Sequence, residues 1–201
     1  GLQPIPVKAA TGAIGGDLSH EFQILAKTGE SELAYDSKLV SDDLINKSYE
    51  EITSMYSASD EMIDRNKSDV VIGRGIEVGH IFNFGIKYSE PLECYVLNNE
   101  GKRVNLHMGS YGIGVSRLTA AIIEAYHDEN GIKWPFQISP FKLNIISALK
   151  NENSIIDQDL YLKLKNKYEN ISLDDRDLSL GKKIKDSELI GVPWTIIIGK
   201  N

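Results

Sequence analysis

One stretch constrains what this chain can fold into more than any other: a glycine-rich strand that runs straight into an apolar helix. Residues 108–126 read MGSYGIGVSRLTAAIIEAY. Gly112 and Gly114 alternate with bulky residues, and on a strand this puts side chains on one face and bare backbone on the other. Because glycine normally weakens a strand, its repetition indicates that a flat ligand lies against the bare face. An ordinary buried strand before an amphipathic helix would give the same pattern, since one glycine-rich motif is weak evidence.

Arg117 follows at the junction between this strand and the helix. A guanidinium is planar and permanently charged, and it binds phosphate or carboxylate groups through parallel hydrogen bonds. Apolar residues from Leu118 to Ala125 then recur at the spacing of a helix face that packs on a core. Arg117 is therefore a candidate ligand for an anionic group at the edge of the bare face.

A second signal lies in residues 75–89, which read GIEVGHIFNFGIKYS. They predict a central strand whose apolar run is interrupted by Glu77 and His80. A carboxylate and an imidazole in a buried strand need partners, which can be hydrogen-bonding groups of the core or a ligand. Upstream, residues 11–17 (TGAIGGD) predict a flexible loop, although a plain turn would also explain glycines so close together.

The remaining segments indicate how the chain is organised. Residues 27–74 are more polar, and Ser41 is expected to cap a helix there. Residues 98–101 (NNEG) separate two apolar runs and predict a β-hairpin that leads into the glycine-rich strand. From Ser139 the pattern becomes strand, helix, strand, helix, strand. This order predicts a second unit of parallel strands joined by right-handed crossovers.

Composition narrows the class of protein. The net charge of −7 argues against broad nonspecific binding of nucleic acid, so an RNA contact would need a local basic patch. The single cysteine rules out an intramolecular disulfide framework and fits a reducing compartment. The sequence has no apolar run long enough to span a bilayer, and its start shows no signal-peptide pattern.

One basic patch lies near the C-terminal end, at Arg176, Lys182, Lys183 and Lys185. In this interpretation Ile184 faces the core and the lysines face outward. Contacts to RNA phosphates and ordinary solvated surface charge would both explain the patch.

Read together, these segments resemble the bacterial-type prolyl-tRNA synthetases, which are class IIa aminoacyl-tRNA synthetases. Residues 108–126 resemble motif 3 of class II, and TGAIGG…SHEF and GHIFNFGIKYS are similar to two elements of the prolyl family. The sequence LDDR…SLGKKIKDSELIGVPWTIIIG resembles its anticodon-binding domain. Most relatives have aspartate where this chain has Ala10, which leaves the anchoring of the loop open. The segment between the first two elements is short, as in the subtype with a short insertion in place of the editing domain.

The resemblance implies an α+β class II catalytic core, an antiparallel sheet flanked by helices, over residues 1–138, with the short insertion at about residues 35–72. It implies an incomplete α/β anticodon-binding domain of β-α-β-α-β order over residues 139–201. We expect the chain to be a fragment of a longer parent, covering the second half of the catalytic domain and most of the anticodon-binding domain. Motifs 1 and 2 of the class are not found in the sequence, so we expect that the chain alone does not aminoacylate tRNA.

The activity that the resemblance implies is that of a proline–tRNA ligase. Such an enzyme activates proline with ATP and Mg²⁺ to prolyl-adenylate and transfers it to the 3′ end of tRNA(Pro). The resemblance gives catalytic and ATP-binding roles to Glu77, His80 and Arg117, and it seats the adenine on Gly112 and Gly114. No residue is assigned as a metal ligand.

The resemblance also implies binding residues and partners. A proline pocket is implied for Gly12, Gly15, Gly16, His20, Phe82 and Ser110. Contacts to tRNA are implied for Arg176, Lys182, Lys183 and Lys185. We further expect a homodimer in the full-length parent and a cytoplasmic location, with neither membrane nor DNA as a partner. The alternative is a non-catalytic, synthetase-derived module that binds a nucleotide or tRNA.

Overall fold

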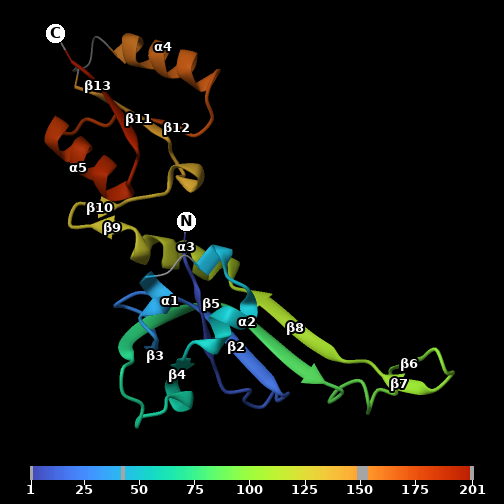
Figure 1. Ribbon diagram of the computed structural model, residues 1–201. Helices are drawn as coiled ribbons and strands as arrows, with labels where there is room; N and C mark the ends of the chain where they lie inside the picture. The colour runs from blue at the N-terminus through green and yellow to red at the C-terminus, as the bar shows by residue number, and fades with distance from the viewer. Residues whose placement is uncertain (1, 42–43, 149–153, 200–201) are drawn as a thin grey trace. The chain divides into compact units, whose positions relative to one another are not determined.

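The structure is a computed structural model that describes residues 2–41, 44–148 and 154–199 (Figure 1). The chain divides into two compact units, one of residues 2–121 and one that begins at Ile122. The boundary between domain types expected at residue 138 stays a prediction. Within the described ranges, no helix is long and apolar enough to cross a membrane.

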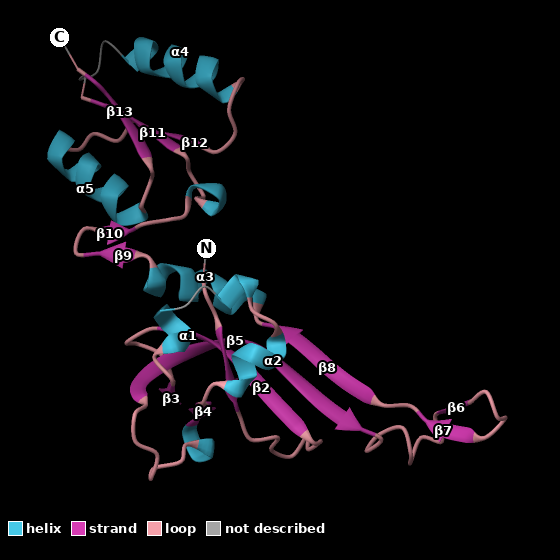
Figure 2. Ribbon diagram, viewed as in Figure 1, coloured by secondary structure: helices cyan, strands magenta, loops and turns pink. Residues whose placement is uncertain are grey.

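The first unit is built on a six-stranded sheet (Figure 2). Its strands are β1 (Ile5–Lys8), β2 (Leu18–Leu25), β3 (Ser31–Tyr35), β4 (Ser57–Ser59), β5 (Val71–Gly85) and β8 (Met108–Ile113). They lie in the order β2-β1-β4-β3-β5-β8, and β2 also pairs with β5, so β1 to β5 close into a ring. The pairs are antiparallel, as expected, except for one parallel bridge between Lys8 and Ala58.

Short helices fill the segment between β3 and β5. They are α1 (Lys38–Ser41), η1 (Leu44–Asn46), α2 (Tyr49–Ser54) and η2 (Asp60–Met62). The expected helix cap at Ser41 is wrong, because the helix of this segment begins after Ser48. Ser48 and Glu51 form a reciprocal capping box, in which each side chain accepts a hydrogen bond from the other residue's backbone N–H. A serine followed three residues later by glutamate is a stronger start signal than a lone serine.

Two cores hold this unit together. In one, Leu39 and Leu44 pack with Ile5, Val7 and Leu33. In the other, α3 (Val115–Ala125) covers one face of the sheet: its Ala121 is fully buried against Ile24, Ile76 and Val78. The helix predicted after Arg117 is therefore confirmed, and it leaves the opposite face of β5 and β8 to other residues.

The predicted hairpin before β8 is also confirmed. It consists of β6 (Tyr95–Leu97) and β7 (Arg103–Asn105), which pair antiparallel. The side-chain oxygen of Asn98 accepts hydrogen bonds from the backbone N–H groups of Glu100 and Lys102. Gly101 follows with φ of +75°, a conformation that glycine adopts at little cost.

The second unit contains a parallel three-stranded sheet with the order β12-β11-β13. Its elements are β9 (His127–Asp128), β10 (Gly131–Ile132), η3 (Phe136–Ile138), β11 (Leu143–Ser147), α4 (Ser154–Lys165), β12 (Ile171–Asp174), α5 (Leu180–Ile190) and β13 (Trp194–Ile198). From β11 onward this is the predicted β-α-β-α-β order with parallel strands. Ile145 and Ile146 form its buried centre, and Gly191 ends α5 in the left-handed conformation.

Candidate functional site

A β-bulge in β5 brings Glu77 and His80 onto one face of the sheet. In the pairing of β2 with β5, Phe22 lies opposite Gly79 but Gln23 lies opposite Glu77, so the register skips Val78. In a regular strand, residues three apart point to opposite faces. The extra residue, Val78, shifts the alternation by one position, so Glu77 and His80 point to the same face. Bulges often redirect side chains in this way beside functional sites. The Nδ1 atom of His80 consequently lies 3.0 Å from Oε1 of Glu77.

Register shows which other side chains share this face. Residues directly opposite each other on paired strands point to the same side, and they form two rows across β2, β5 and β8. One row is Ser19, Phe82 and Ser110, and the other is Glu21, His80 and Gly112. We call the side that carries these six residues and Glu77 the site face. Phe22, Ile76 and Val78 point the other way, toward α3.

Polar contacts link the predicted catalytic residues on the site face. Oε1 of Glu77 accepts a hydrogen bond from Nδ1 of His80, because a carboxylate can only accept. Nη1 of Arg117 donates to the Glu77 backbone carbonyl at 3.0 Å and to its Oε2 at 3.2 Å. Nε2 of His80 lies 2.6 Å from Oγ of Ser19. The structure thus brings together Glu77, His80 and Arg117, the three residues to which the sequence analysis gave catalytic roles.

A hollow of about 460 Å³ lies beside these contacts, lined by residues that include Glu77, His80, Gly112, Gly114 and Arg117. A Cβ placed on Gly112 would have a single neighbour within 4 Å, the His80 carbonyl oxygen at 3.8 Å. The glycine is therefore not required by packing within the described residues. Bare backbone at this point leaves room for a flat group against the strand, as the sequence pattern predicts.

Phe82 and Ser110, two residues of the predicted proline pocket, lie opposite each other on β5 and β8. The Phe82 ring stacks on the His80 imidazole with ring centroids 4.0 Å apart and an angle of 19° between the planes. A small apolar surface therefore adjoins the polar contacts of His80.

The glycine loop of residues 11–17 is fixed to the end of β5. The carbonyl oxygen of Ile14 accepts hydrogen bonds from Nζ of Lys87 at 2.6 Å and from the Tyr88 hydroxyl at 2.7 Å. Gly16 has φ of +106°, and a Cβ there would lie 2.3 Å from the Asn83 carbonyl oxygen. Lys87 and Tyr88 thus anchor the loop through the Ile14 carbonyl.

His20, another residue of the predicted proline pocket, lies on a different face of the sheet from Phe82 and Ser110. It lies opposite Ile81, so it points to the face that α3 covers, away from Phe82 and Ser110. There its Nδ1 lies 3.0 Å from the Tyr49 hydroxyl. Burial lowers the pKa of His20 below its usual value, and the nearby charges of Lys8 and His80 lower it further. The placement of His20 in one pocket with Phe82 is corrected accordingly.

Two residues of the site face, Ser19 and Glu21, have no assigned role in the sequence prediction, although Glu21 matches a position of the prolyl family. Their neighbour His20 was the predicted residue, but alternation along a strand puts the residues on either side of it on the opposite face. The ligand atoms of Glu21, Glu77 and His80 all lie within 4.8 Å of one another. The Nε2 atom of Gln23 donates to Glu21 at 2.8 Å. The sequence signal that could have found both residues is the alternation in SHEF.

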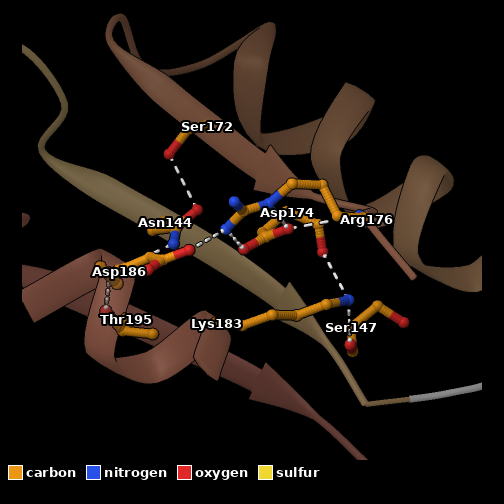
Figure 3. Close-up of polar contacts among 9 residues, drawn as sticks. Asn144, Ser147, Ser172, Asp174, Arg176, Lys183, Asp186 and Thr195 are labelled. Carbon is orange, nitrogen blue, oxygen red and sulfur yellow. Dashed lines mark hydrogen bonds and ion pairs between the residues drawn. The ribbon is translucent and has the colours of Figure 1, made fainter. Parts of the chain in front are cut away.

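In the second unit, the basic residues predicted to contact tRNA fall into two groups. Lys182 and Lys185 are exposed on α5. Lys183 is only 4% exposed, and its Nζ donates to the carbonyl oxygens of Ser147 at 2.9 Å and Asp174 at 3.2 Å (Figure 3). The structure contradicts the outward placement of Lys183: it faces the interior, and Ile184 is only half-buried. The ammonium stabilises the carboxyl ends of β11 and β12, where carbonyl groups need donors.

Arg176 is held by two carboxylates (Figure 3). It contacts Asp174 through Nε at 2.9 Å and through Nη2 at 2.7 Å, and Nη2 also lies 2.9 Å from Asp186. The Arg176 hydrogen bonds hold the pKa of Asp174 below its usual value. The turn after β12 is therefore tied to α5, and Lys182 and Lys185 remain the exposed lysines of the predicted patch.

Comparisons with known domains and with solved structures find one likeness over the C-terminal part of the chain and one over nearly all of it. The family model described as "Anticodon binding domain" matches residues 145–201. The fold of 98% of the chain is similar to part of a solved structure, the Giardia lamblia prolyl-tRNA synthetase in complex with prolyl-adenylate, with a TM-score of 0.59. This chain covers 34% of that one, and at 18% identity the likeness concerns the fold alone.

Sequence comparisons identify the particular relatives. The proline–tRNA ligase of Wolbachia sp. subsp. Drosophila simulans (strain wRi) is 47% identical over 205 residues, which are 100% of this chain and 48% of that protein. The proline–tRNA ligase of Paracoccus denitrificans is 44% identical over 99% of this chain and 49% of its own length. The predicted resemblance to the prolyl-tRNA synthetases is thus confirmed over the whole chain. The chain spans about half the length of these relatives.

Proposed function

We propose that this chain is part of a proline–tRNA ligase. The observation that carries the proposal is the site face, on which Glu77, His80 and Arg117 are joined beside the bare backbone of Gly112. The chain is also similar over its whole length to proline–tRNA ligases. The solved relative with the similar fold holds prolyl-adenylate, which is the intermediate that such a site would form.

The proposed reaction has two steps. An oxygen of the proline carboxylate attacks the α-phosphorus of ATP, a new P–O bond forms, and the bond to the leaving pyrophosphate breaks. The terminal ribose hydroxyl of the tRNA then attacks the activated carbonyl, and AMP leaves. Neither step needs a covalent bond to the protein, so catalysis rests on positioning and on stabilising the charge that builds up on the phosphates.

The described residues divide these tasks between them. Arg117 offers guanidinium donors to the terminal phosphate of ATP, since its contacts to Glu77 use Nη1 and a guanidinium has five N–H donors. The strand backbone at Gly112 and Gly114 seats the adenine. Phe82 and Ser110, with the glycine loop, shape a pocket for proline.

The donor set on the site face also fits the Mg²⁺ that accompanies ATP. Glu21, Glu77 and His80 offer ligand atoms within 4.8 Å of one another, and Mg²⁺ prefers carboxylate oxygens together with phosphates of the substrate. Glu21 is thus the residue that would hold the ion, because both oxygens of Glu77 accept hydrogen bonds from His80 and Arg117. The ion would neutralise charge on the phosphates.

The rest of the proposal concerns the parent protein. Lys182 and Lys185 are the exposed lysines that would contact anticodon phosphates of tRNA(Pro). The full-length protein acts as a cytoplasmic homodimer in this proposal. The 201-residue chain alone does not charge tRNA, and charging by the isolated chain at the rate of the full-length protein would refute this last point.

Proline-dependent ATP–pyrophosphate exchange by the full-length protein that carries this chain tests the proposed function. We expect strong exchange with proline and weak exchange with alanine, cysteine, threonine and glycine. Exchange with another amino acid would keep the class and overturn the specificity. A folded protein that exchanges with none of them would favour the alternative, a non-catalytic module that binds a nucleotide or tRNA.

A further inference from the structure

Ser19 lies on the site face but is almost closed to solvent. It is 2% exposed, whereas the side chains of His80 and Glu77 are 22% and 30% exposed. A group as buried as Ser19 does not meet a substrate directly. Its hydroxyl is nevertheless 2.6 Å from Nε2 of His80, the ring nitrogen that does not contact Glu77.

The direction of the hydrogen bonds follows from the chemistry of the groups. Oε1 of Glu77 only accepts, so Nδ1 of His80 carries a proton. In the neutral ring Nε2 is then an acceptor, and the Ser19 hydroxyl donates to it. If the ring gains a second proton, the hydroxyl oxygen accepts from Nε2 instead. Ser19 can therefore hold the ring in either protonation state.

The contacts continue from His80 to the arginine. One carboxylate oxygen of Glu77 is taken by His80 and the other by Nη1 of Arg117. Rotation of the imidazole would release Oε1 and free the carboxylate to turn. This would loosen one of the two contacts of Nη1 with Glu77, the one to Oε2 at 3.2 Å, and leave the one to the backbone carbonyl at 3.0 Å. Stacking on Phe82 limits tilting of the His80 ring, but stacked rings can still rotate in their plane. The Ser19 hydroxyl opposes this rotation at Nε2, on the other side of the ring from the Glu77 contact.

We propose that Ser19 is a positioning residue for ATP. It fixes the His80 ring, the ring fixes the Glu77 carboxylate, and the carboxylate orients Arg117 together with the Glu77 backbone carbonyl, where the triphosphate binds. This inference rests on the proposed function and adds to it a buried residue on β2 that touches neither substrate. The proline side of the site, at Phe82 and Ser110, is not part of this series of contacts.

The test is steady-state ATP–pyrophosphate exchange by the full-length protein with Ser19→Ala. We expect the KM for ATP to rise about tenfold, equal to about 1.4 kcal/mol, while the KM for proline stays within about twofold. Ser19→Thr keeps the hydroxyl, so it should restore the KM for ATP. Ser19→Cys has nearly the size of serine but a poor hydrogen-bonding group, and it should behave like Ser19→Ala even if the alanine variant folds badly.

Ser57→Ala is the matched control. Ser57 is a buried serine on β4, which pairs with β1 and β3 of the same sheet, and its hydroxyl donates to the Pro6 carbonyl at 2.7 Å. This variant loses a comparable buried hydrogen bond and should leave both KM values unchanged. Ser19 variants whose KM for ATP stays within twofold of wild type, or whose two KM values rise together, would overturn the inference. A wild-type protein without proline-dependent exchange would instead overturn the proposed function.

Discussion

Replacing Lys183 by methionine tests whether a lysine in a basic stretch holds the second unit together instead of meeting RNA. Methionine keeps most of the length and volume of the side chain but removes the ammonium. Two hydrogen bonds from a charged donor disappear, at 2.9 Å to Ser147 and at 3.2 Å to Asp174. Both acceptors are backbone carbonyls at the carboxyl ends of buried strands.

The magnitude follows from these contacts. A hydrogen bond to a charged group contributes about 1.5–3 kcal/mol, so the two bonds amount to about 3–6 kcal/mol. Methionine recovers part of this because a buried ammonium carries a desolvation cost. We therefore expect the free energy of unfolding of the second unit to fall by about 3 kcal/mol. For a unit of about 60–100 residues this lowers Tm by about 12–24 °C.

Thermal and urea unfolding followed by circular dichroism measures the effect. Lys182→Met is the matched control, because Lys182 is exposed and exposed substitutions change stability by about 0.5 kcal/mol or less. In tRNA binding we expect the reverse order: Lys182→Met weakens binding and reduces its salt dependence, provided that Lys182 meets a phosphate. A Lys183→Met protein that melts within about 4 °C of wild type, a shift that corresponds to less than about 1 kcal/mol, would refute the assigned structural role.

Three further outcomes are expected. Gly16→Ala should lower the free energy of unfolding in urea by more than about 2 kcal/mol, because φ is +106° and the new Cβ would meet the Asn83 carbonyl. Gly12→Ala is the control: φ is +55° but the space around it is open, so the cost should be only about 1 kcal/mol. Gly112→Val should leave Tm nearly unchanged but abolish ATP binding measured by calorimetry, since only the His80 carbonyl lies near its Cβ; retained binding would contradict the adenine seat. The pKa of His20 is lowered in the folded protein, so as the pH falls the unfolded chain takes up the His20 proton before the folded protein does. The contribution of His20 to the free energy of unfolding should therefore be fully present above about pH 6.5. Below that pH it should fall by at most about 1.4 kcal/mol per pH unit. The same pH series with His20→Gln should lack this component.

Much of the candidate site could be predicted because its charged residues lie in two short, recognisable stretches of the sequence. Glu77, His80 and Arg117 stand beside glycines in two strand-like stretches, and each needed a partner. The structure supplies those partners within the same group. What the sequence could not show is why residues three apart meet, since the bulge at Val78 depends on how β2 pairs with β5.

The two wrong placements, of His20 and of Lys183, concern which face of a strand or helix a side chain occupies. A step of one residue along the chain changes that face. His20 was grouped with Phe82, but a one-residue step along β2 moves a side chain to the other face, and Ser19 holds the position beside His80. On α5 the apolar Ile184 was expected to face inward, yet Lys183 does so. A long side chain can bury its stem and still satisfy its ammonium when carbonyl groups lie within reach. A prediction from apolar periodicity considers only the apolar residues of a helix. It therefore cannot identify a lysine whose ammonium binds backbone carbonyl groups in the interior.

The pairing of β5 has a consequence for the order of folding. This strand is bonded to β2, β3 and β8, and it closes the ring of strands in the first unit. While the chain is being synthesised, β1 and β2 can form a local pair, but the ring stays open until residue 85 is available. Pairing between strands that are far apart in the sequence slows folding, because the chain between them loses conformational entropy before the stabilising contacts form. Amide protons in the middle of β5 should therefore exchange with solvent only when the whole first unit opens.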